Sequence, residues 1–337
     1  MQDTKLYIVV PCYNEEEVID DSAQKLLCKL QELISEKRIS NKSVILFVND
    51  GSTDATKKLL LKLCEQHSEF ACINFVKNYG HQSAILAGML FAKDYADAVI
   101  TIDADLQQDI NAMEKFLEEY DRGADVVYGV RNDRNTDGAI KKWTATVFYK
   151  FMHFLGVNII ANSADYRLLS QKALMALDGY KETALFLRGL IPFMGLPSAV
   201  VHFDVKEREK GKSKYTLSKM MNLALDGITS FSAKPLHLIL GAGAIMTGFA
   251  FVMILYSLID YFVGSPVAGY TTMVISIWLV GGILMMSMGM IGEYIGKIYQ
   301  ETKKRPRYVI ESCVFRDNRG EEACFNASKR DEENMEA

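Results

Sequence analysis

The sequence predicts an α/β domain with a mostly parallel sheet, followed by an interfacial helix and a two-helix transmembrane hairpin. Three observations support this prediction. Short apolar runs alternate with helical stretches over residues 5–130, which is the pattern of βαβ units with right-handed crossovers. The runs are apolar throughout, as in a sheet that helices cover on both faces. Two long uncharged stretches follow residue 235.

The composition argues against two classes of protein. The net charge of −4 is unlike the strongly basic balance of nucleic-acid-binding domains, so no nucleic-acid partner is expected. The six cysteines form no CxxC pair and no metal-finger spacing, which favours free thiols in a reducing compartment. The chain begins with polar residues and a strand, so no cleavable signal peptide is expected.

Five strands are predicted in the first part of the chain, each ending in polar or turn-forming residues. They are expected at 6–10, 44–48, 72–76, 97–101 and 125–130. Helices between them are predicted from the spacing of apolar residues at 15–34, from a cap at 52–54 through 63, at 83–92 and at 110–120. Neither GxGxxG after the first strand nor GxxxxGK[ST] occurs, which argues against dinucleotide and P-loop sites.

Beyond residue 141 the pattern is less regular. A helix is predicted at 142–155, a polar break at 162–167 and a further strand at 199–205, before a basic loop at 206–214. The cytoplasmic domain is therefore expected to span residues 1–214. Residues 215–234 have apolar residues and few charges, which predicts an amphipathic helix at a membrane interface. The alternative is a surface helix packed on the domain.

Two uncharged stretches predict the hairpin within residues 235–300. Residues 238–259 hold 22 residues without a charge, or about 33 Å of helix against a hydrocarbon core of about 30 Å. The expected spans are about 236–262 and 270–292. Lys and Arg residues flank both spans and are missing between them, so both termini and the α/β domain are expected on the cytoplasmic side of the cell membrane.

Residues 301–337 are expected to form a cytoplasmic basic flank and a disordered tail. From Glu311 to Ala337 there are eight acids and four bases with little apolar content, which is typical of disorder. Gly292 and Gly296 form a GxxxG motif that could pack helices or subunits. A homo-oligomer is therefore one expectation.

Asp103 and Asp105 stand where the fourth predicted strand ends. Open α/β sheets bind ligands at this rim, and alternation along an extended chain would point both carboxylates the same way. Like charges this close are costly unless a cation shares them. Oxygen ligands near a phosphate suit Mg²⁺ or Mn²⁺. The alternative is a helix cap at Asp109 preceded by two solvated acids.

Four motifs occur in order, each just after a predicted strand. They are VPCYNEE at 10–16, VNDGSTD at 48–54, NYGHQ at 78–82 and DADLQ at 103–107. Together they resemble inverting family 2 glycosyltransferases with the GT-A nucleotide-sugar-binding fold, over about residues 5–230. The ADYR run at 164–167, the basic loop and the two expected spans narrow the resemblance to the polyprenyl-phosphate type, similar to bactoprenol glucosyltransferases and dolichol-phosphate mannose synthase.

The resemblance implies roles for individual residues. Asp103, Asp105 and Gln107 would bind the metal, with Asp103 bridging metal and nucleoside. Asp165 matches the catalytic base, although with a phosphate acceptor it could instead orient that acceptor or pair with Arg167. His81 is expected to be structural or a polar contact near the pocket. The residues that would contact the nucleotide-sugar are Pro11, Tyr13, Glu15, Asp50, Gly80, Asp103 and Ala104. The catalytic residues would include Asp165 and Arg131. The acceptor phosphate would be bound by Arg131, Arg208, Ser213 and Lys214.

The implied activity is transfer of one sugar, with inversion, from a nucleotide-sugar to undecaprenyl phosphate or a similar polyprenyl phosphate. UDP-glucose is the first expected donor, and UDP-N-acetylglucosamine or GDP-mannose are alternatives. A lipid monophosphate is already anionic at neutral pH and needs no general base. A processive polysaccharide synthase is disfavoured because QxxRW is missing. A sugar-nucleotide-sensing scaffold is disfavoured because Asp103, Asp105, Asp165 and Arg208 are all present.

Overall fold

The computed structural model describes residues 4–132, 160, 163–182, 186–204, 269–316 and 322–326, with scattered positions between 236 and 252. The chain divides into two compact units. The first contains an α/β sheet built from both ends of the chain, and the second contains the long helix α10 (Tyr270–Thr302). The helix expected at 142–155 and the basic loop at 206–214 lie outside the described residues.

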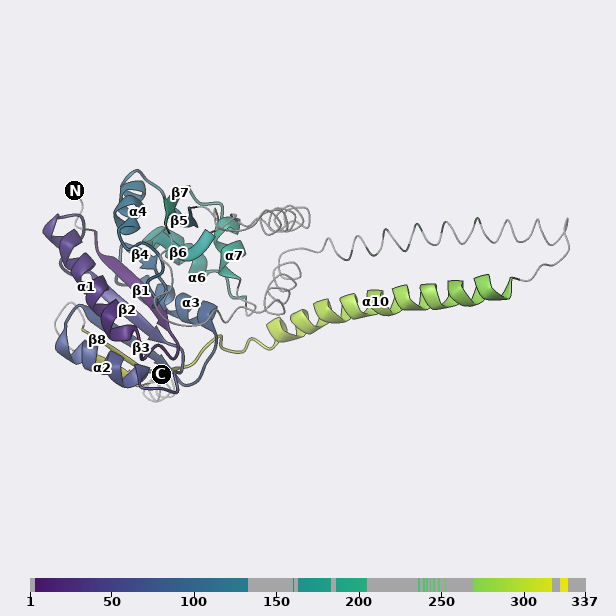
Figure 1. Cartoon of the computed structure of the whole chain (residues 1–337), viewed down its shortest axis with the longest axis horizontal. Coiled ribbons are helices and arrows are strands. Elements are labelled where there is room, and N and C mark those ends of the chain that lie inside the picture. Colours follow the sequence, from purple (N-terminus) through teal and green to yellow (C-terminus); the bar gives the residue numbers. More distant parts are fainter. Residues whose placement is uncertain are drawn as a thin grey trace, which may run out of the picture. The chain divides into compact units, whose positions relative to one another are not determined.

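The described strands of the first unit form one nine-stranded sheet in the order β7-β5-β6-β4-β1-β2-β3-β8-β9 (Figure 1). Strands β1 to β4 pair in parallel, and so do β5 and β7. Strand β6 runs antiparallel between β4 and β5. The prediction of a mostly parallel sheet is confirmed. The strands are β1 (Leu6–Cys12), β2 (Val44–Asn49), β3 (Phe70–Phe75), β4 (Ala98–Thr101), β5 (Val126–Arg131), β6 (Ser163–Ser170), β7 (Ser198–Phe203), β8 (Ile310–Arg316) and β9 (Glu322–Asn326).

Helices cover both faces of this sheet, which explains why β1 is buried along its whole length. On one face, alternate strand residues such as Ile8 and Phe47 pack with Leu26 and Phe116 in a single core. On the other face α3 lies so close that a Cβ at Gly88 would come within 2.3 Å of the Val9 side chain. The first face carries α1 (Ile19–Ser35), α2 (Thr56–Gln66) and α4 (Ala112–Asp121), and the second carries α3 (His81–Ala92) with α6 (Gln171–Asp178) beside it.

Strand β6 differs from the prediction, because residues 162–167 were expected to be a polar break. The strand is instead buried in the middle of the sheet. Its residues alternate between faces: Tyr166 and Leu168 belong to the hydrophobic core, while Asp165 and Arg167 form an ion pair with each other. A charged pair can occupy a central strand because each group compensates the other.

The C-terminal segment also differs from the prediction of a disordered tail at 311–337. Strand β8 pairs antiparallel with β3, and β9 pairs with β8. The Phe315 ring is buried and lies 5.1 Å from Phe91 and 5.2 Å from Tyr95, measured between ring centroids. Strand β8 therefore covers the edge that β3 would otherwise expose, which protects its backbone groups. Residues 317–321 and 327–337 lie outside the described part.

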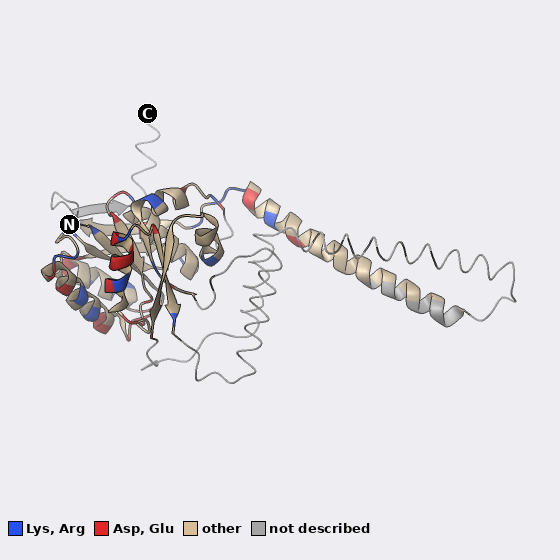
Figure 2. Ribbon diagram, turned by 90° about the horizontal axis from the view of Figure 1, so that it is seen from above, with Lys and Arg blue, Asp and Glu red and all other residues tan. Residues whose placement is uncertain are grey.

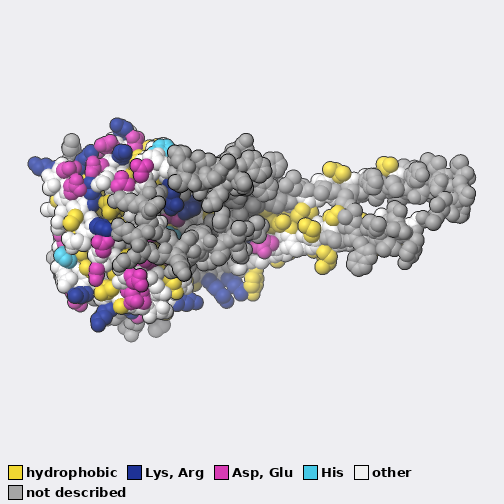
Figure 3. Space-filling view, viewed as in Figure 1, with side chains coloured by type: hydrophobic (Ala, Val, Ile, Leu, Met, Phe, Trp, Pro, Cys, Tyr) yellow, Lys and Arg dark blue, Asp and Glu magenta, His cyan; other side chains and the backbone are white. Residues whose placement is uncertain are grey.

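The predicted hairpin and multi-pass membrane localisation need correction. The interfacial helix at 215–234 and most of the first span at 236–262 lie outside the described residues. The second span falls within α10, which continues past residue 292 through Glu293, Lys297 and Glu301 (Figure 2). That helix exposes apolar side chains such as Met273 and Leu284 (Figure 3). Even so, no helix in the described ranges meets the length and hydropathy required to cross a membrane.

Phe315→Ala should lower the free energy of unfolding by about 3–5 kcal/mol, because a buried aromatic side chain is removed from the contact between β8 and α3. Denaturant unfolding measures this loss. Glu311→Gln on the same strand is the control, since its ion pair with Lys57 (2.7 Å) is exposed and exposed pairs contribute about 0–1 kcal/mol. Wild-type stability in Phe315→Ala would show that β8 does not pack on the sheet.

Candidate active site

The loops after β1 to β4 meet at one rim of the sheet. The register places Cys12 beside Asn49, and Asn49 beside Asn74, at the carboxyl ends of the first three strands. Strand β6 runs the opposite way, so its first residues lie at this same rim, where Asp165 is near the end of β4. All four sequence motifs therefore gather where open α/β sheets bind ligands.

The first two motifs hold each other through backbone-to-side-chain hydrogen bonds. Asn14 adopts a left-handed conformation (φ 53°), which asparagine tolerates better than most residues. Its backbone N donates to Ser52 Oγ at 3.0 Å, and its Oδ1 accepts from the Thr53 N–H at 2.9 Å. The Glu15 N–H donates to Thr56 Oγ1 at 2.9 Å. The Tyr13 ring stays exposed at this loop pair.

Asp50 joins the second motif to the third. Its buried carboxylate accepts from the backbone N–H groups of Tyr79 at 2.6 Å and Gly80 at 2.9 Å. Burial raises the pKa of Asp50, and these two hydrogen bonds only partly oppose that effect. Gly51 (φ 62°) passes so close to Lys77 that a Cβ would lie 2.2 Å from its carbonyl carbon. Asp50 thus holds the loop of the third motif against the loop of the second motif.

A pocket of about 330 Å³ opens beside these loops. Among the residues predicted to bind the donor, Tyr13 lines it. Pro11 and Ala104 are buried, and the Ala104 carbonyl accepts a hydrogen bond from Ser22 Oγ at 2.6 Å. The other lining residues are Asn49, Gly51, Ser52, Thr53, Lys57, Phe75, Val76, Lys77, Asn78 and Glu311.

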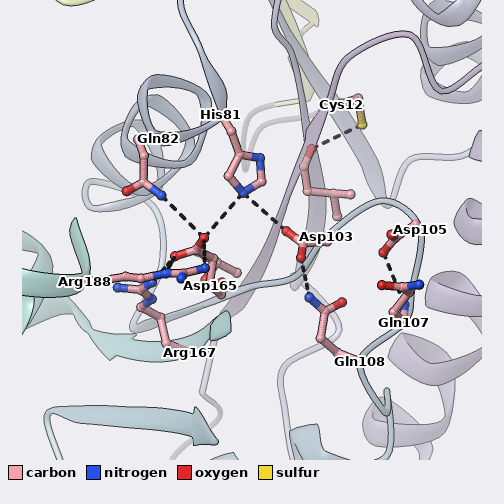
Figure 4. Close-up of polar contacts among 12 residues, drawn as sticks. Cys12, His81, Gln82, Asp103, Asp105, Gln107, Gln108, Asp165, Arg167 and Arg188 are labelled. Carbon is pink, nitrogen blue, oxygen red and sulfur yellow. Dashed lines mark hydrogen bonds and ion pairs between the residues drawn. The ribbon is translucent and has the colours of Figure 1, made fainter. Parts of the chain in front are cut away.

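His81, the first residue of α3, lies between two acidic side chains (Figure 4). Its Nε2 is 3.4 Å from Asp103 Oδ1 and 3.7 Å from Asp165 Oδ2. Burial lowers the pKa of His81, but the two carboxylates outweigh burial and raise the pKa above its usual value. His81 is therefore an ionic bridge between the metal motif and β6, which agrees with its expected role as a polar contact.

Asp165 is buried among cationic groups (Figure 4). It pairs with Arg167 on its own strand and with Arg188, whose Nε and Nη2 lie 3.2 and 2.9 Å from its two oxygens. Burial alone would raise the pKa of Asp165, but Arg188 and Arg167 overcome this effect and hold the pKa well below its usual range. A carboxylate that is this well paired stays ionised at neutral pH and is a weak base.

The metal motif is a turn and not the extended segment that was expected. Leu106 has φ 46°, and its N–H donates to the Asp103 carbonyl at 3.2 Å. Figure 4 shows Asp105 and Gln107 together on one side of Asp103, with His81 and Asp165 on the other. Strand alternation therefore does not determine where the two carboxylates point.

The side-chain oxygens of this motif nevertheless fit a metal cation that is bound by oxygen ligands. Asp103 Oδ2 accepts from Gln108 Nε2, whereas the buried Oδ1 makes no hydrogen bond within the described part of the chain. This oxygen lies 3.4 Å from His81 Nε2, a longer contact that contributes to the raised pKa of His81. Asp105 is exposed close by. A buried carboxylate oxygen without a donor suits a hard divalent ion, although the described residues include no cluster of three or more acidic, His or Cys ligands.

The predicted acceptor residues are only partly described. Arg131 ends β5 and is exposed, and β5 is the neighbour of β6, which carries Asp165. Arg208, Ser213 and Lys214 lie outside the described residues.

Sequence reasoning missed Arg188 and Gln108. A signal for Arg188 existed, because it is the single charge in the apolar stretch 184–194, and a cation in such a stretch needs a carboxylate partner.

Comparisons with known proteins identify a family and relatives that cover most of the chain. A model of "Glycosyl transferase family 2" matches residues 7–178, about half of the chain. An uncharacterized glycosyltransferase, YkoT, of Bacillus subtilis (strain 168) is 43% identical over 93% of each chain. A bactoprenol glucosyl transferase of Shigella phage SfX is 38% identical over 91% of this chain and 99% of that protein. A prophage bactoprenol glucosyl transferase homolog of Escherichia coli (strain K12) is 37% identical over 91% and 98%.

The fold and the relatives define a glycosyltransferase with a GT-A-like α/β domain. The chain belongs to glycosyl transferase family 2.

Arg167→Met should lower the free energy of unfolding by about 3–5 kcal/mol, because it leaves the Asp165 charge in the sheet with one guanidinium fewer. Denaturant unfolding measures the loss. Arg122→Met is the matched control, since Arg122 pairs with Glu119 on the exposed surface of α4, and such pairs contribute about 0–1 kcal/mol. Equal stability of the two variants would contradict the role of Arg167 in the buried pair.

Proposed function

We propose that the enzyme transfers one sugar, with inversion, from a nucleotide-sugar to a polyprenyl phosphate such as undecaprenyl phosphate. The pairing of Asp165 with two guanidinium groups carries this proposal. A hydroxyl acceptor would need a free base to remove its proton. A phosphate monoester has a second pKa of about 6 and reaches the site as an anion. The site therefore suits a phosphate oxygen as the nucleophile.

In this reaction a phosphate oxygen of the acceptor forms a bond to the anomeric carbon of the sugar. The bond from that carbon to the nucleoside diphosphate breaks, and the diphosphate leaves with the electron pair. No proton has to move in the step. Catalysis then depends on holding the reacting atoms in line and on cationic groups near the developing charge.

The relatives support the class of acceptor and favour one donor. Two of them are named bactoprenol glucosyl transferase or its homolog, and they match 91% of this chain. These names support a polyprenyl phosphate acceptor and make UDP-glucose the first donor to test. UDP-N-acetylglucosamine and GDP-mannose remain the alternatives. The pocket beside Tyr13 is a candidate site for the nucleoside.

Charged and polar residues at the rim would hold the remaining parts of the substrates. Mg²⁺ or Mn²⁺ held by Asp103, Asp105 and Gln107 would neutralise charge on the diphosphate leaving group. Arg131, Arg208, Ser213 and Lys214 are the proposed contacts of the acceptor phosphate, because cationic side chains form strong charge-assisted hydrogen bonds with phosphate.

Undecaprenyl phosphate should accept labelled sugar from UDP-glucose, whereas undecaprenol should accept none, because Asp165 cannot serve as a base for a neutral hydroxyl. The measurement is the transfer of label into an organic extract, with the same enzyme and a panel of labelled nucleotide-sugars. Equal transfer to the alcohol would contradict the proposed acceptor chemistry. Transfer from another nucleotide-sugar in preference to UDP-glucose would change the donor and leave the acceptor assignment intact.

Asp105→Asn should reduce transfer by about two orders of magnitude or more without unfolding the protein, because a metal ligand is lost at an exposed position. The measurement is the initial rate at saturating Mg²⁺ and Mn²⁺, with circular dichroism to verify the fold. Asp109→Asn is the matched control in the same loop, where the Asp109 carboxylate accepts a hydrogen bond from the Asn111 N–H at 3.1 Å. Wild-type rates in Asp105→Asn, or in excess chelator, would remove the metal from the proposal.

A further inference from the structure

We propose that Arg188, at the start of α7 (Leu187–Phe193), is a positioning residue that acts on sugar transfer through Asp165. The proposal rests on the proposed function in one respect, because it takes Asp165 to face the acceptor. Arg188 lies beyond the region that matches the family model, which ends at residue 178.

Arg188 contacts both oxygens of the Asp165 carboxylate. Nε lies 3.2 Å from Oδ1, and Nη2 lies 2.9 Å from Oδ2. Arg167, in contrast, donates to Oδ1 through one nitrogen. A two-point contact by a planar guanidinium determines the orientation of a carboxylate as well as its position. Arg188 is therefore the group that sets the plane of this carboxylate.

Gln82 and Arg167, which contact Asp165 (Figure 4), also hold the backbone of Leu187 next to Arg188. Gln82 donates from Nε2 to Asp165 Oδ2 at 3.4 Å, and its Oε1 accepts from the Leu187 N–H at 3.3 Å. The Leu187 carbonyl accepts from Arg167 Nη1 at 3.4 Å. Asp165 is therefore connected to the start of α7 by two routes besides its direct contact with Arg188. One route runs through Gln82 and the other through Arg167, and both end at the backbone of Leu187. Arg188 therefore starts from a fixed backbone position.

The two arginines differ in exposure, which separates their roles. The Arg167 side chain is 2% exposed, and the Arg188 side chain is 31% exposed. A fully buried partner such as Arg167 contributes to the stability of β6. Arg188 is part-exposed and so lies between the buried Asp165 and the solvent, from which an acceptor would approach.

The position of Asp165 also affects the metal motif. His81 lies between Asp165 and Asp103, within 3.7 Å and 3.4 Å of their oxygens. A shift of Asp165 would move the ion pair that joins β6 to the turn at Asp103. Arg188 therefore helps to fix the spacing between the donor side and the acceptor side of the site. Misplacement of reacting groups by about 1 Å can cost about 10²-fold in rate.

A double-mutant cycle tests the proposal with the full chain. The variants are Arg188→Met, Asp165→Asn and the combination, each measured for kcat and for the KM of both substrates. Arg188→Met should lower kcat by about 10²-fold with the donor KM unchanged. The combination should be no slower than Asp165→Asn alone, because Arg188 acts through Asp165. Arg188→Lys should stay impaired, since lysine keeps the charge but loses the two-point contact.

Two further measurements keep the test decisive. Arg122→Met, which removes an exposed arginine from its carboxylate partner, should keep the wild-type kcat. Added guanidinium below its denaturing concentration should restore part of the kcat of Arg188→Ala, which a packing defect would not allow. This rescue decides the matter if Asp165→Asn is too slow to measure or if Arg188→Met does not fold.

Wild-type kcat in Arg188→Met, additive losses in the cycle, or the absence of guanidinium rescue would each overturn the proposal. Its failure is distinguishable from failure of the proposed function, because the cycle uses whichever acceptor the wild-type enzyme accepts. A wild-type enzyme that prefers undecaprenol would refute the proposed acceptor, and the cycle would still determine whether Arg188 acts through Asp165.

Discussion

The buried charge of Asp165 is the constraint on which the rest of the site depends. A carboxylate inside a sheet is tolerated only with cationic partners, and Arg167 and Arg188 supply them from β6 and α7. This compensation lets a polar segment run between β4 and β5. It also ties α7 to the start of α3 through Gln82. The contacts of the Asp165 carboxylate thus hold β6, α7 and the start of α3 together.

The two central acids have different surroundings, which gives them different chemical uses. Asp165 is held by guanidinium groups on both oxygens, so it stays ionised and takes up a proton poorly. Asp103 has no guanidinium partner in the described structure, and its buried Oδ1 has only the long 3.4 Å contact with His81 there, so this carboxylate can accept a cation. His81 joins the two. Contrasting environments of neighbouring carboxylates often separate their roles in an active site.

The sheet depends on residues from both ends of the chain. Strand β8 returns after α10 and pairs with β3, and Phe315 packs against Phe91 of α3 and against Tyr95, just beyond that helix. Glu311 on β8 also lines the pocket beside Tyr13. The family model covers residues 7–178, so β8 and α7 add to the rim from outside that region. Such additions are where members of one family can differ in substrate while they share a fold.

The sequence by itself determined the strands β1 to β5 and β7, the helices between them and the rim where four motifs meet, because these signals are local runs and turns. It did not reveal β6, β8 or the pairing of Arg188 with Asp165. Their stability depends on partners that are distant in the sequence, as when Asp165 meets Arg188 or β8 meets β3. The apolar run at 270–292 predicted a bounded span, yet α10 continues to Thr302. Only the tertiary structure decided these points, because charge compensation and edge pairing depend on which groups meet in space.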